Sequence, residues 1–516
     1  MEILSKSLTG DLVTSSNPRP EIPPFEIKEV GRIREVKKGI AYIKGFPSCI
    51  NGQLIDFGQG VKGLVIGFNE DEVLSLILGD VNRVKLENEV IAVPEVFRIP
   101  VGENFIGRVV SALGEPCDDK GEIKATDFYP IFREALGVIE RIPVDKPLYT
   151  GIRTIDTIIP LARGQRELIV GDRMTGKTTL AIDTILNQKD EDVICIYCCI
   201  GRDFFSLERI VELFAEKGTL DYSIVVAAPA ICSSNEQYLA PYTACSLGEY
   251  FMLNGRDVLV VFDDLTRHAW IYRQLSLLLE RFPGREAYPG DMFYLHSQLM
   301  ERAGRLKPGA GGGSMTFLPI VETQQGDITG YIPSNLVSMT DGQIYLSADL
   351  FHGGFKPAID IGLSVSRIGS KVQAQALREV SRGLRQEYFQ YRDLVRMTKM
   401  KARVSKEAEK QIKKGEALRE FFIQDKHKPV SVVEQIIIFY ALSRDILKSL
   451  SPEELKRFKD GIYDFFIRNY PQLIEEIEEG EILTADCKKE LERGLGEFMK
   501  KESQHEEKRV SMGDKG

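Results

Sequence analysis

Leu168-Ile-Val-Gly-Asp-Arg-Met-Thr-Gly-Lys-Thr178 is the stretch of sequence that decides the expected fold. Its apolar start predicts a buried strand, and its last eight residues fit the phosphate-binding pattern G-x-x-x-x-G-K-[ST]. In this pattern, backbone N–H groups of a turn and of a helix start surround the phosphate oxygens. Lys177 reaches the β- and γ-phosphates, and the Thr178 hydroxyl ligates Mg²⁺. The ligands we expect are ATP or ADP with Mg²⁺, and the loop residues expected to bind them are Gly171, Asp172, Arg173, Met174, Thr175, Gly176, Lys177, Thr178 and Thr179.

The residues around this loop alternate between apolar strands and helices. We predict strands at 168–170, 193–200, 224–228 and 258–262, and helices at 178–187, 205–216, 241–253 and 269–279. Alternation of this kind predicts a parallel sheet with helices on both faces. We place a RecA-like P-loop α/β domain at 93–373.

A P-loop of this type works with a carboxylate at the end of a neighbouring strand. The strand at 258–262 is followed directly by Asp263 and Asp264. We expect Asp263 to hold Mg²⁺ through water. The alternative is that Asp263 caps the next helix, but Asp264 fits that capping role better.

The two ends of the chain follow other patterns. Short apolar runs at about ten-residue spacing predict a small closed β-barrel at 25–92, with strands at 31–36, 40–43, 52–57, 62–68, 72–77 and 89–93. Helical apolar spacing predicts a C-terminal α-helical domain at 374–501, with helices at 374–397, 406–422, 432–447, 453–469 and 488–501. The whole is a multidomain α/β protein. Residues 1–24 are expected to form a proline-rich lead-in, and 502–516 a charged, disordered tail.

Composition narrows the function classes. The 516 residues carry a formal net charge of −9, which disfavours nucleic-acid binding, and no apolar run approaches the roughly 20 residues that span a bilayer. The N-terminus lacks a signal pattern, so we expect a cytoplasmic or similarly reducing compartment. Cys195 and Cys198 form a C-x-x-C pair inside a predicted buried strand, which favours buried thiols over a redox pair.

Longer motifs resemble the α subunits of F-type ATP synthases. Among them are Arg281-Phe-Pro-Gly-Arg-Glu-Ala-Tyr-Pro-Gly-Asp291, Gly362-Leu-Ser-Val-Ser-Arg367, and the segments 148–156, 163–177 and 323–327. The resemblance covers about residues 25–500 in the same domain order. It implies an alternating α3β3 ring around a central γ stalk, held by a peripheral stator and joined to a membrane Fo sector. Flow of H⁺ or Na⁺ there drives ATP formation at β. The chain would lie peripherally at the cytoplasmic face of the inner or plasma membrane.

The same resemblance assigns roles to residues outside the loop. Arg367 would reach in trans to the catalytic site of the adjacent β subunit, and Ser364 would set the geometry of its loop. The alternative for Arg367 is a surface ion pair. Gln424 matches the adenine region of the family, whereas Lys426 stands where a second Gln is usual. The lead-in lacks an amphipathic stretch, so attachment to a stator δ subunit by that route is not expected.

Arg202 sets the chain apart from catalytic relatives. After the glycine that ends the strand at 193–200, those relatives have the Glu that positions the attacking water. Arginine cannot act as a base, so we expect a non-catalytic, regulatory nucleotide site. The α pattern has Gln at both Arg202 and Met174. Our hypothesis is that Arg202 supplies a cation near the terminal phosphate, and the alternative is a degraded site that binds weakly.

Three rival functions remain open from the sequence. A homohexameric secretion-type ATPase would need a catalytic Glu where Arg202 stands. An RNA-dependent hexameric helicase would need a basic, aromatic-interleaved surface, which the acidic composition opposes. A purely structural subunit would leave the nucleotide site empty.

Overall fold

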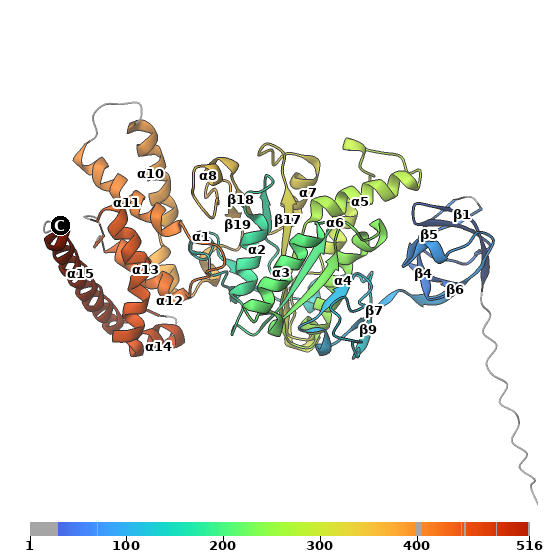
Figure 1. The fold of residues 1–516 in the computed structure, drawn as a ribbon, viewed down its shortest axis with the longest axis horizontal. Helices are drawn as coiled ribbons and strands as arrows, with labels where there is room; N and C mark the ends of the chain where they lie inside the picture. Colours follow the sequence, from blue (N-terminus) through green and yellow to red (C-terminus); the bar gives the residue numbers. More distant parts are fainter. Residues whose placement is uncertain are drawn as a thin grey trace, which may run out of the picture.

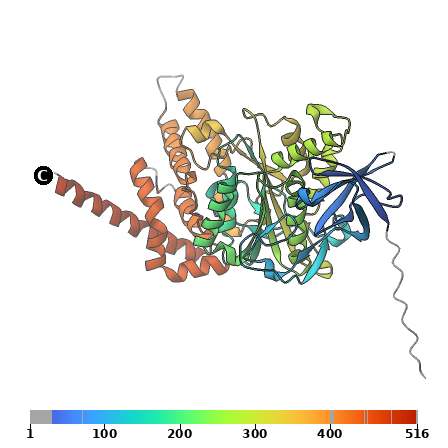
Figure 2. The same ribbon diagram turned by 45° about the vertical axis from the view of Figure 1, so that its right-hand side comes forward.

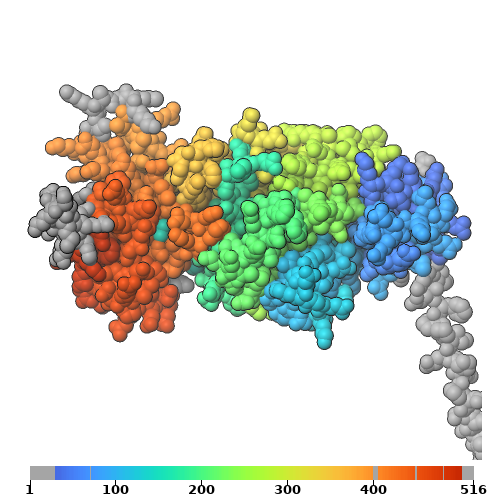
Figure 3. All heavy atoms as spheres, viewed as in Figure 1, coloured from blue at the N-terminus to red at the C-terminus, as the bar shows by residue number. Residues whose placement is uncertain are grey.

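The computed structural model arranges the chain as three parts in a row along its longest axis (Figures 1 and 2). It describes residues 29–69, 71–398, 405–444, 446–447, 450–480 and 482–513. The expected lead-in at 1–24 lies outside the described residues. In the space-filling view the blue barrel, the central part and the orange-to-red helices form one elongated body (Figure 3). The expected domain limits at 92, 373 and 501 stay predictions.

The N-terminal part is a closed barrel with the strand order β1-β2-β5-β4-β3-β6, which confirms the prediction. Alternating side chains such as Ile33, Ile43 and Ile55 fill its interior. Closure leaves no free strand edge, which suits a small antiparallel sheet. The strands are β1 (Val30–Lys37), β2 (Ile40–Lys44), β3 (Gln53–Gly58), β4 (Val61–Phe68), β5 (Val73–Leu78) and β6 (Glu89–Val96).

The central part is built on a nine-stranded sheet with the order β19-β18-β12-β17-β15-β13-β14-β8, to which β16 is added beside β17. All the strand pairs are parallel except β16–β17 and β18–β19. The strands are β8 (Val109–Ser111), β12 (Leu168–Gly171), β13 (Val193–Ile200), β14 (Ser223–Ala228), β15 (Asp257–Asp263), β16 (Gly304–Arg305), β17 (Ser314–Glu322), β18 (Gly342–Leu346) and β19 (Val365–Ser366). Two small sheets flank it, β7 (Arg98–Val101) with β9 (Asp127–Pro130), and β10 (Pro147–Leu148) with β11 (Leu161–Ala162).

Helices cover both faces of this sheet. Alternate residues of β13 belong to two separate hydrophobic cores. On one face of the sheet, Cys195 and Tyr197 pack with α2 and α3. On the other face, Ile196 and Cys198 pack with α4 and α5. Both cysteines of the C-x-x-C pair are therefore buried and free, as predicted. The helices are α1 (Arg153–Ile158), α2 (Lys177–Leu186), α3 (Phe204–Glu216), α4 (Ser234–Leu253), α5 (Leu265–Leu278), α6 (Met292–Met300), α7 (Tyr331–Met339) and α8 (Ala348–His352).

Helix α4 corrects one prediction. The expected start at Pro241 was wrong, because the helix begins at Ser234 and Pro241 lies inside it. The start is set by a capping box in which Ser233 and Glu236 bond each other's backbone N–H groups. A capping box satisfies N–H groups that would otherwise have no partner, and here it outweighs the proline signal.

The C-terminal part is helical, as predicted, with two differences. The expected helix at 374–397 is broken, because Gly383 adopts φ +87° between α9 and α10. The expected disorder of the tail is wrong for residues 502–513, because α15 continues to Gly513. Its Glu-, Lys- and Arg-rich sequence favours a helix as much as a solvated coil. The helices are α9 (Gln375–Ser381), α10 (Leu384–Thr398), α11 (Lys406–Phe422), α12 (Val432–Ser443), α13 (Pro452–Asn469), α14 (Pro471–Gly480) and α15 (Ala485–Gly513). Among the helices of the described residues, none is long and apolar enough to cross a bilayer.

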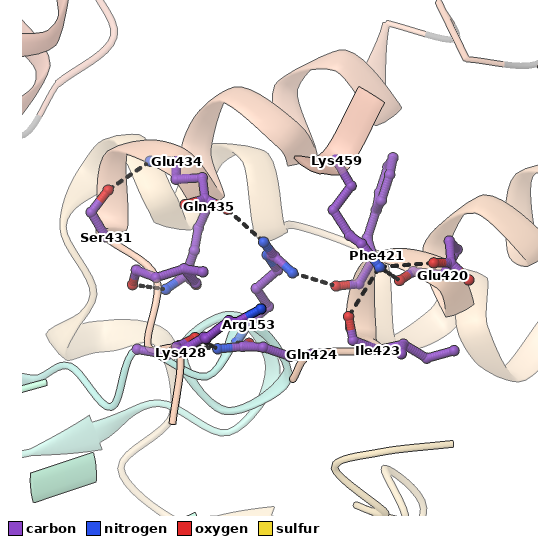
Figure 4. Close-up of polar contacts among 12 residues, drawn as sticks. Arg153, Glu420, Phe421, Ile423, Gln424, Lys428, Ser431, Glu434, Gln435 and Lys459 are labelled. Atoms are coloured by element: carbon purple, nitrogen blue, oxygen red, sulfur yellow. Dashed lines mark hydrogen bonds and ion pairs between the residues drawn. The ribbon is translucent and has the colours of Figure 1, made fainter. Parts of the chain in front are cut away.

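Polar contacts dock the outer parts on the central one. On the barrel side, Asn235 of α4 donates to Gly39 O at 2.9 Å and to Ile77 O at 2.8 Å. On the helical side, Arg153 of α1 donates to Glu434 of α12 at 2.5 Å and to Phe421 O at 3.5 Å (Figure 4). Arg153 and Glu434 are only 5% and 14% exposed, so this ion pair is shielded from water.

We expect Arg153→Ala to loosen the docking of α12. Removing one partner of a buried pair leaves the other charge unpaired, at a cost of about 3–5 kcal/mol. Thermal unfolding and hydrogen exchange in α11 and α12 measure the loss. Lys428→Ala is the matched control, because its pair with Asp425 is 73% and 77% exposed and such pairs contribute less than about 1 kcal/mol. Equal effects of the two substitutions would contradict the docking role.

Candidate nucleotide site

A cleft of ≈ 820 Å³ opens at the carboxyl ends of β12, β13 and β15. In open parallel sheets, ligands bind at this edge. Of the residues expected to bind nucleotide or metal, the cleft is lined by Arg173, Met174, Thr175, Gly176, Lys177, Thr178, Thr179, Arg202, Asp263 and Gln424. Gly171 and Asp172 support the loop from behind. Asp172 accepts hydrogen bonds from the Thr323 hydroxyl at 2.6 Å and the Gly326 N–H at 2.8 Å.

The phosphate loop has the backbone that its sequence demands. Gly176 adopts φ 99° immediately before α2, a left-handed conformation that glycine reaches without strain. Met174 is also left-handed, at φ 61°, and its side chain is 89% exposed at the mouth of the cleft. Lys177 is buried at the start of α2, where its ammonium donates to Gly171 O at 2.9 Å and Asp172 O at 2.6 Å. Burial lowers the pKa of Lys177, while neighbouring carboxylates counter this effect.

A compact cluster forms around Asp263, which is fully buried at the end of β15. Its Oδ2 accepts hydrogen bonds from the Thr178 hydroxyl and the Tyr197 hydroxyl, each at 2.8 Å. Arg202 Nη1 lies 2.7 Å from both carboxylate oxygens and 2.6 Å from Thr178 Oγ1. Burial opposes the charge on Arg202, but Asp263 raises the pKa of the guanidinium above its ordinary value.

Mg²⁺ does not fit this arrangement of Thr178 and Asp263. The ion requires oxygen ligands in a near-octahedral shell at about 2.0–2.1 Å. Here a guanidinium nitrogen contacts the same three oxygen atoms at hydrogen-bond distance. The sequence places Thr178 and Asp263 together correctly, but it does not reveal that a cationic side chain fills the space between them.

Asp264 has the capping role expected for it. Its carboxylate accepts the Arg267 N–H at 2.8 Å at the start of α5. Burial, followed by the charge of Asp263, raises the pKa of Asp264 to about 7. Arg267 also donates a hydrogen bond to Gly201 O, which ties the start of α5 to the turn that carries Arg202.

Gln424 lines the cleft, but its amide is used within the protein. The oxygen accepts the Arg153 N–H at 3.2 Å, and the nitrogen donates to Gly151 O at 2.7 Å and Lys428 O at 2.8 Å (Figure 4). Gln424 therefore shapes the junction between α1 and the helical part. Lys426 lines the cleft beside it.

Sequence reasoning missed several polar residues that face the cleft. Asp183 of α2 accepts the His427 N–H at 2.9 Å, and burial raises the pKa of Asp183 to about 7. Sequence reasoning also missed Tyr197, which does not line the cleft but whose buried hydroxyl donates to Asp263 at 2.8 Å. The alternation of side chains along β13 places Tyr197 on the face of the sheet that packs against α2. This alternation is a sequence signal that could have predicted its position. The other missed cleft residues are Arg267, Glu322, Lys356 and Asp425.

Arg367 lies away from this cleft. Its side chain is exposed and makes no ion pair or side-chain hydrogen bond with any part of the chain that the structure describes. Its backbone is held firmly, because the Arg367 N–H donates to Asp341 O at 2.8 Å. Ser364 is buried and bonds the Tyr345 N–H at 2.9 Å and Asp360 O at 2.7 Å. The loop is thus fixed, and the charge of its exposed Arg367 side chain partly counters the effect of burial, which raises the pKa of Glu167.

The three parts of the chain match three family profiles. The ATP synthase alpha/beta family beta-barrel domain matches residues 26–93, the nucleotide-binding domain 151–366 and the C-terminal domain 373–498. A protein named ATP synthase subunit alpha from Clostridium acetobutylicum is 46% identical over 476 residues, 92% of this chain and 94% of that protein. Proteins of the same name from Petrotoga mobilis and Dehalococcoides mccartyi are 44% and 45% identical over 478 residues, covering 92% of this chain and 95% of each relative.

We expect Lys177→Ala to weaken binding of ATP or ADP. Hydrogen bonds to charged groups contribute about 1.5–3 kcal/mol, which is roughly 10- to 150-fold in affinity. Equilibrium dialysis of the full chain measures the change. Lys189→Ala, at an exposed lysine just beyond α2, is the matched control and should leave affinity unchanged. Unchanged affinity in Lys177→Ala would remove the phosphate loop as the binding determinant.

Proposed function

The chain belongs to the ATP synthase alpha/beta family, and on that premise we propose that it is the non-catalytic α subunit of a rotary F-type ATP synthase. It binds ATP or ADP in a regulatory site and alternates with catalytic β subunits in an α3β3 ring around the γ stalk. The ring is joined to a peripheral stator and a membrane Fo sector, and it works at the cytoplasmic face of the membrane. The complex couples flow of H⁺ or Na⁺ to ATP synthesis or hydrolysis.

The observation that carries this proposal is the pairing of Arg202 with Asp263. Hydrolysis needs a carboxylate free to position and polarise water. Arg202 stands where catalytic relatives have that carboxylate, and it also neutralises Asp263 at 2.7 Å. The other acidic residues that line the cleft each have a partner of their own. Asp264 caps α5, Glu322 lies 3.5 Å from Arg173, Asp183 bonds His427, and Asp425 bonds Lys428.

Nucleotide is the ligand we assign to the cleft. Lys177, the start of α2 and the left-handed turn at Gly176 suit the phosphates. Thr178 and Asp263 are the residues that the sequence assigns to Mg²⁺. Because Arg202 already contacts their oxygen atoms, we do not assign the ion to them.

Arg367 is proposed to act on a nucleotide held by the neighbouring β subunit. Phosphoryl transfer spreads negative charge over the γ-phosphate oxygens, and an arginine supplied by another subunit stabilises that charge. The exposed Arg367 side chain lies on a loop that Arg385 of α10 also supports, by donating to Ile361 O at 3.0 Å and Ser364 O at 2.9 Å. A fixed backbone with a free guanidinium suits that role better than a surface ion pair.

We expect the purified chain to lack ATPase activity when no β subunit is present. Loss of a general base costs about 10²–10⁴ in rate, and Arg202 replaces the base here. Steady-state phosphate release by the β-free chain should equal that of Lys177→Ala. Turnover that exceeds background and disappears in Lys177→Ala would contradict the non-catalytic assignment.

We expect Arg367→Lys to abolish most turnover of the reconstituted α/β complex while leaving assembly intact. An arginine in trans is worth ~10³–10⁵ in rate, or about 4–7 kcal/mol of barrier. Lysine cannot reproduce its planar fork. Nucleotide affinity at β should change little, because the charge that Arg367 meets develops in the transition state.

Both quantities are measured on the same complex, as ATP hydrolysis and nucleotide affinity at β. Arg382→Lys, at the exposed break between α9 and α10, is the matched control and should keep full turnover. Turnover of Arg367→Lys within a few-fold of the control would exclude Arg367 from the mechanism.

A further inference from the structure

The hydrogen bonds around Asp263 use the oxygen atoms that a metal ion would need. Oδ2 receives the Thr178 hydroxyl, the Tyr197 hydroxyl and Arg202 Nη1, and Oδ1 receives Arg202 Nη1. An ionised carboxylate offers about four lone-pair sites. The Thr178 hydroxyl donates a hydrogen bond to Asp263 and accepts one from Arg202. Protein donors therefore already occupy both carboxylate oxygens and the hydroxyl oxygen.

The main chain that carries Arg202 is fixed in place. The Gly201 N–H donates to Ala228 O at 2.8 Å, and Arg202 O accepts the Ala230 N–H at 2.7 Å. These bonds hold the turn after β13 against the end of β14. The backbone of Arg202 is therefore fixed, and only its side chain extends to Asp263.

Withdrawal of Arg202 would leave a buried charge without a counter-ion. Asp263 is 1% exposed, and Arg202 supplies its ion pair. Breaking a buried pair from one side is strongly unfavourable, because the remaining charge is neither paired nor solvated. A second cation cannot share the position, because two positive charges a few ångströms apart repel each other. The guanidinium and Mg²⁺ are thus alternatives at this position.

The guanidinium also faces the ligand side of the cleft. The side chain is 25% exposed and lines the cleft with Lys177 and Thr178. Nη1 makes all of the side-chain hydrogen bonds of Arg202, so Nε and Nη2 have no hydrogen-bond partner among the residues that the structure describes. Arginine presents its N–H groups in a fork that matches phosphate oxygens. Arg202 can thus pair with Asp263 on one side and a phosphate on the other.

We propose that this site binds ATP or ADP without a divalent metal ion, with the Arg202 guanidinium in the position between Thr178 and Asp263 that the sequence pattern assigns to Mg²⁺. The inference rests on the proposed nucleotide-binding function and concerns the chemical form of the ligand, a metal-free nucleoside di- or triphosphate. A side-chain cation cannot dissociate. Nucleotide occupancy should therefore not require free Mg²⁺.

The test compares ATP binding by the full chain in EDTA and in excess Mg²⁺, measured by equilibrium dialysis. For the unaltered chain, Mg²⁺ should leave the affinity unchanged or weaken it, because complexed ATP is removed from the binding form. Arg202→Gln vacates the position, and its affinity should rise with Mg²⁺ by at least about tenfold, equivalent to 1.4 kcal/mol. Lys177→Ala should bind weakly in both conditions.

A second readout counts metal ions directly. With Mn²⁺ as a paramagnetic probe, electron paramagnetic resonance should find far less than one bound ion per bound nucleotide in the unaltered chain. Arg202→Gln should approach one ion per nucleotide. One Mn²⁺ per nucleotide in the unaltered chain, or affinity that rises tenfold or more with Mg²⁺, would overturn the inference and leave the proposed function standing. Absence of ATP binding in both conditions would instead overturn the proposed function, and this inference with it.

Discussion

The buried carboxylate of Asp263 is the constraint on which the site depends. A charge with 1% of its side chain exposed must be paired and hydrogen-bonded, or the sheet edge could not close around it. Its three donors come from separate elements: Thr178 from α2, Tyr197 from β13, and Arg202 from the turn after β13. Satisfying one charge therefore fixes the start of α2 against β13 and β15. Because the phosphate loop leads directly into α2, these contacts also fix the position of the loop.

Much of the fold could be predicted because it depends on short-range patterns. The barrel strands follow the two-residue alternation of apolar side chains, and β13 was predicted with its exact limits from a continuous apolar run. Errors arose where two local signals competed. At α4 the capping box of Ser233 and Glu236 outweighed Pro241, and beyond residue 501 a charged sequence suited a helix as well as a coil.

The site divides in the same way. The identity of the loop residues and the proximity of Thr178 to Asp263 follow from motif spacing. Motif spacing does not predict the direction of a long side chain. From the sequence alone, Arg202 could point toward a phosphate or toward Asp263, and only the tertiary contacts decide between them. Gln424 and Arg153 show the same limit. They bond across 271 positions, and only the docking of the helical part brings them together.

Two arginines of this chain illustrate how surroundings set the role of one residue type. Arg202 is three-quarters buried, and its charge is largely neutralised by the ion pair with Asp263. Because Arg202 is held by Asp263, it cannot move to stabilise new negative charge on a phosphate during a reaction. This arrangement suits a site that retains its ligand. Arg367 has an anchored backbone but an exposed side chain without a partner among the described residues. Its charge remains available to a group outside the chain. An uncommitted guanidinium can stabilise charge that appears only in a transition state, whereas a guanidinium already paired with a carboxylate stabilises the ground state of its own site. The difference in burial therefore supports the proposal that the chain holds one nucleotide without acting on it and that Arg367 acts on another nucleotide in a neighbouring subunit.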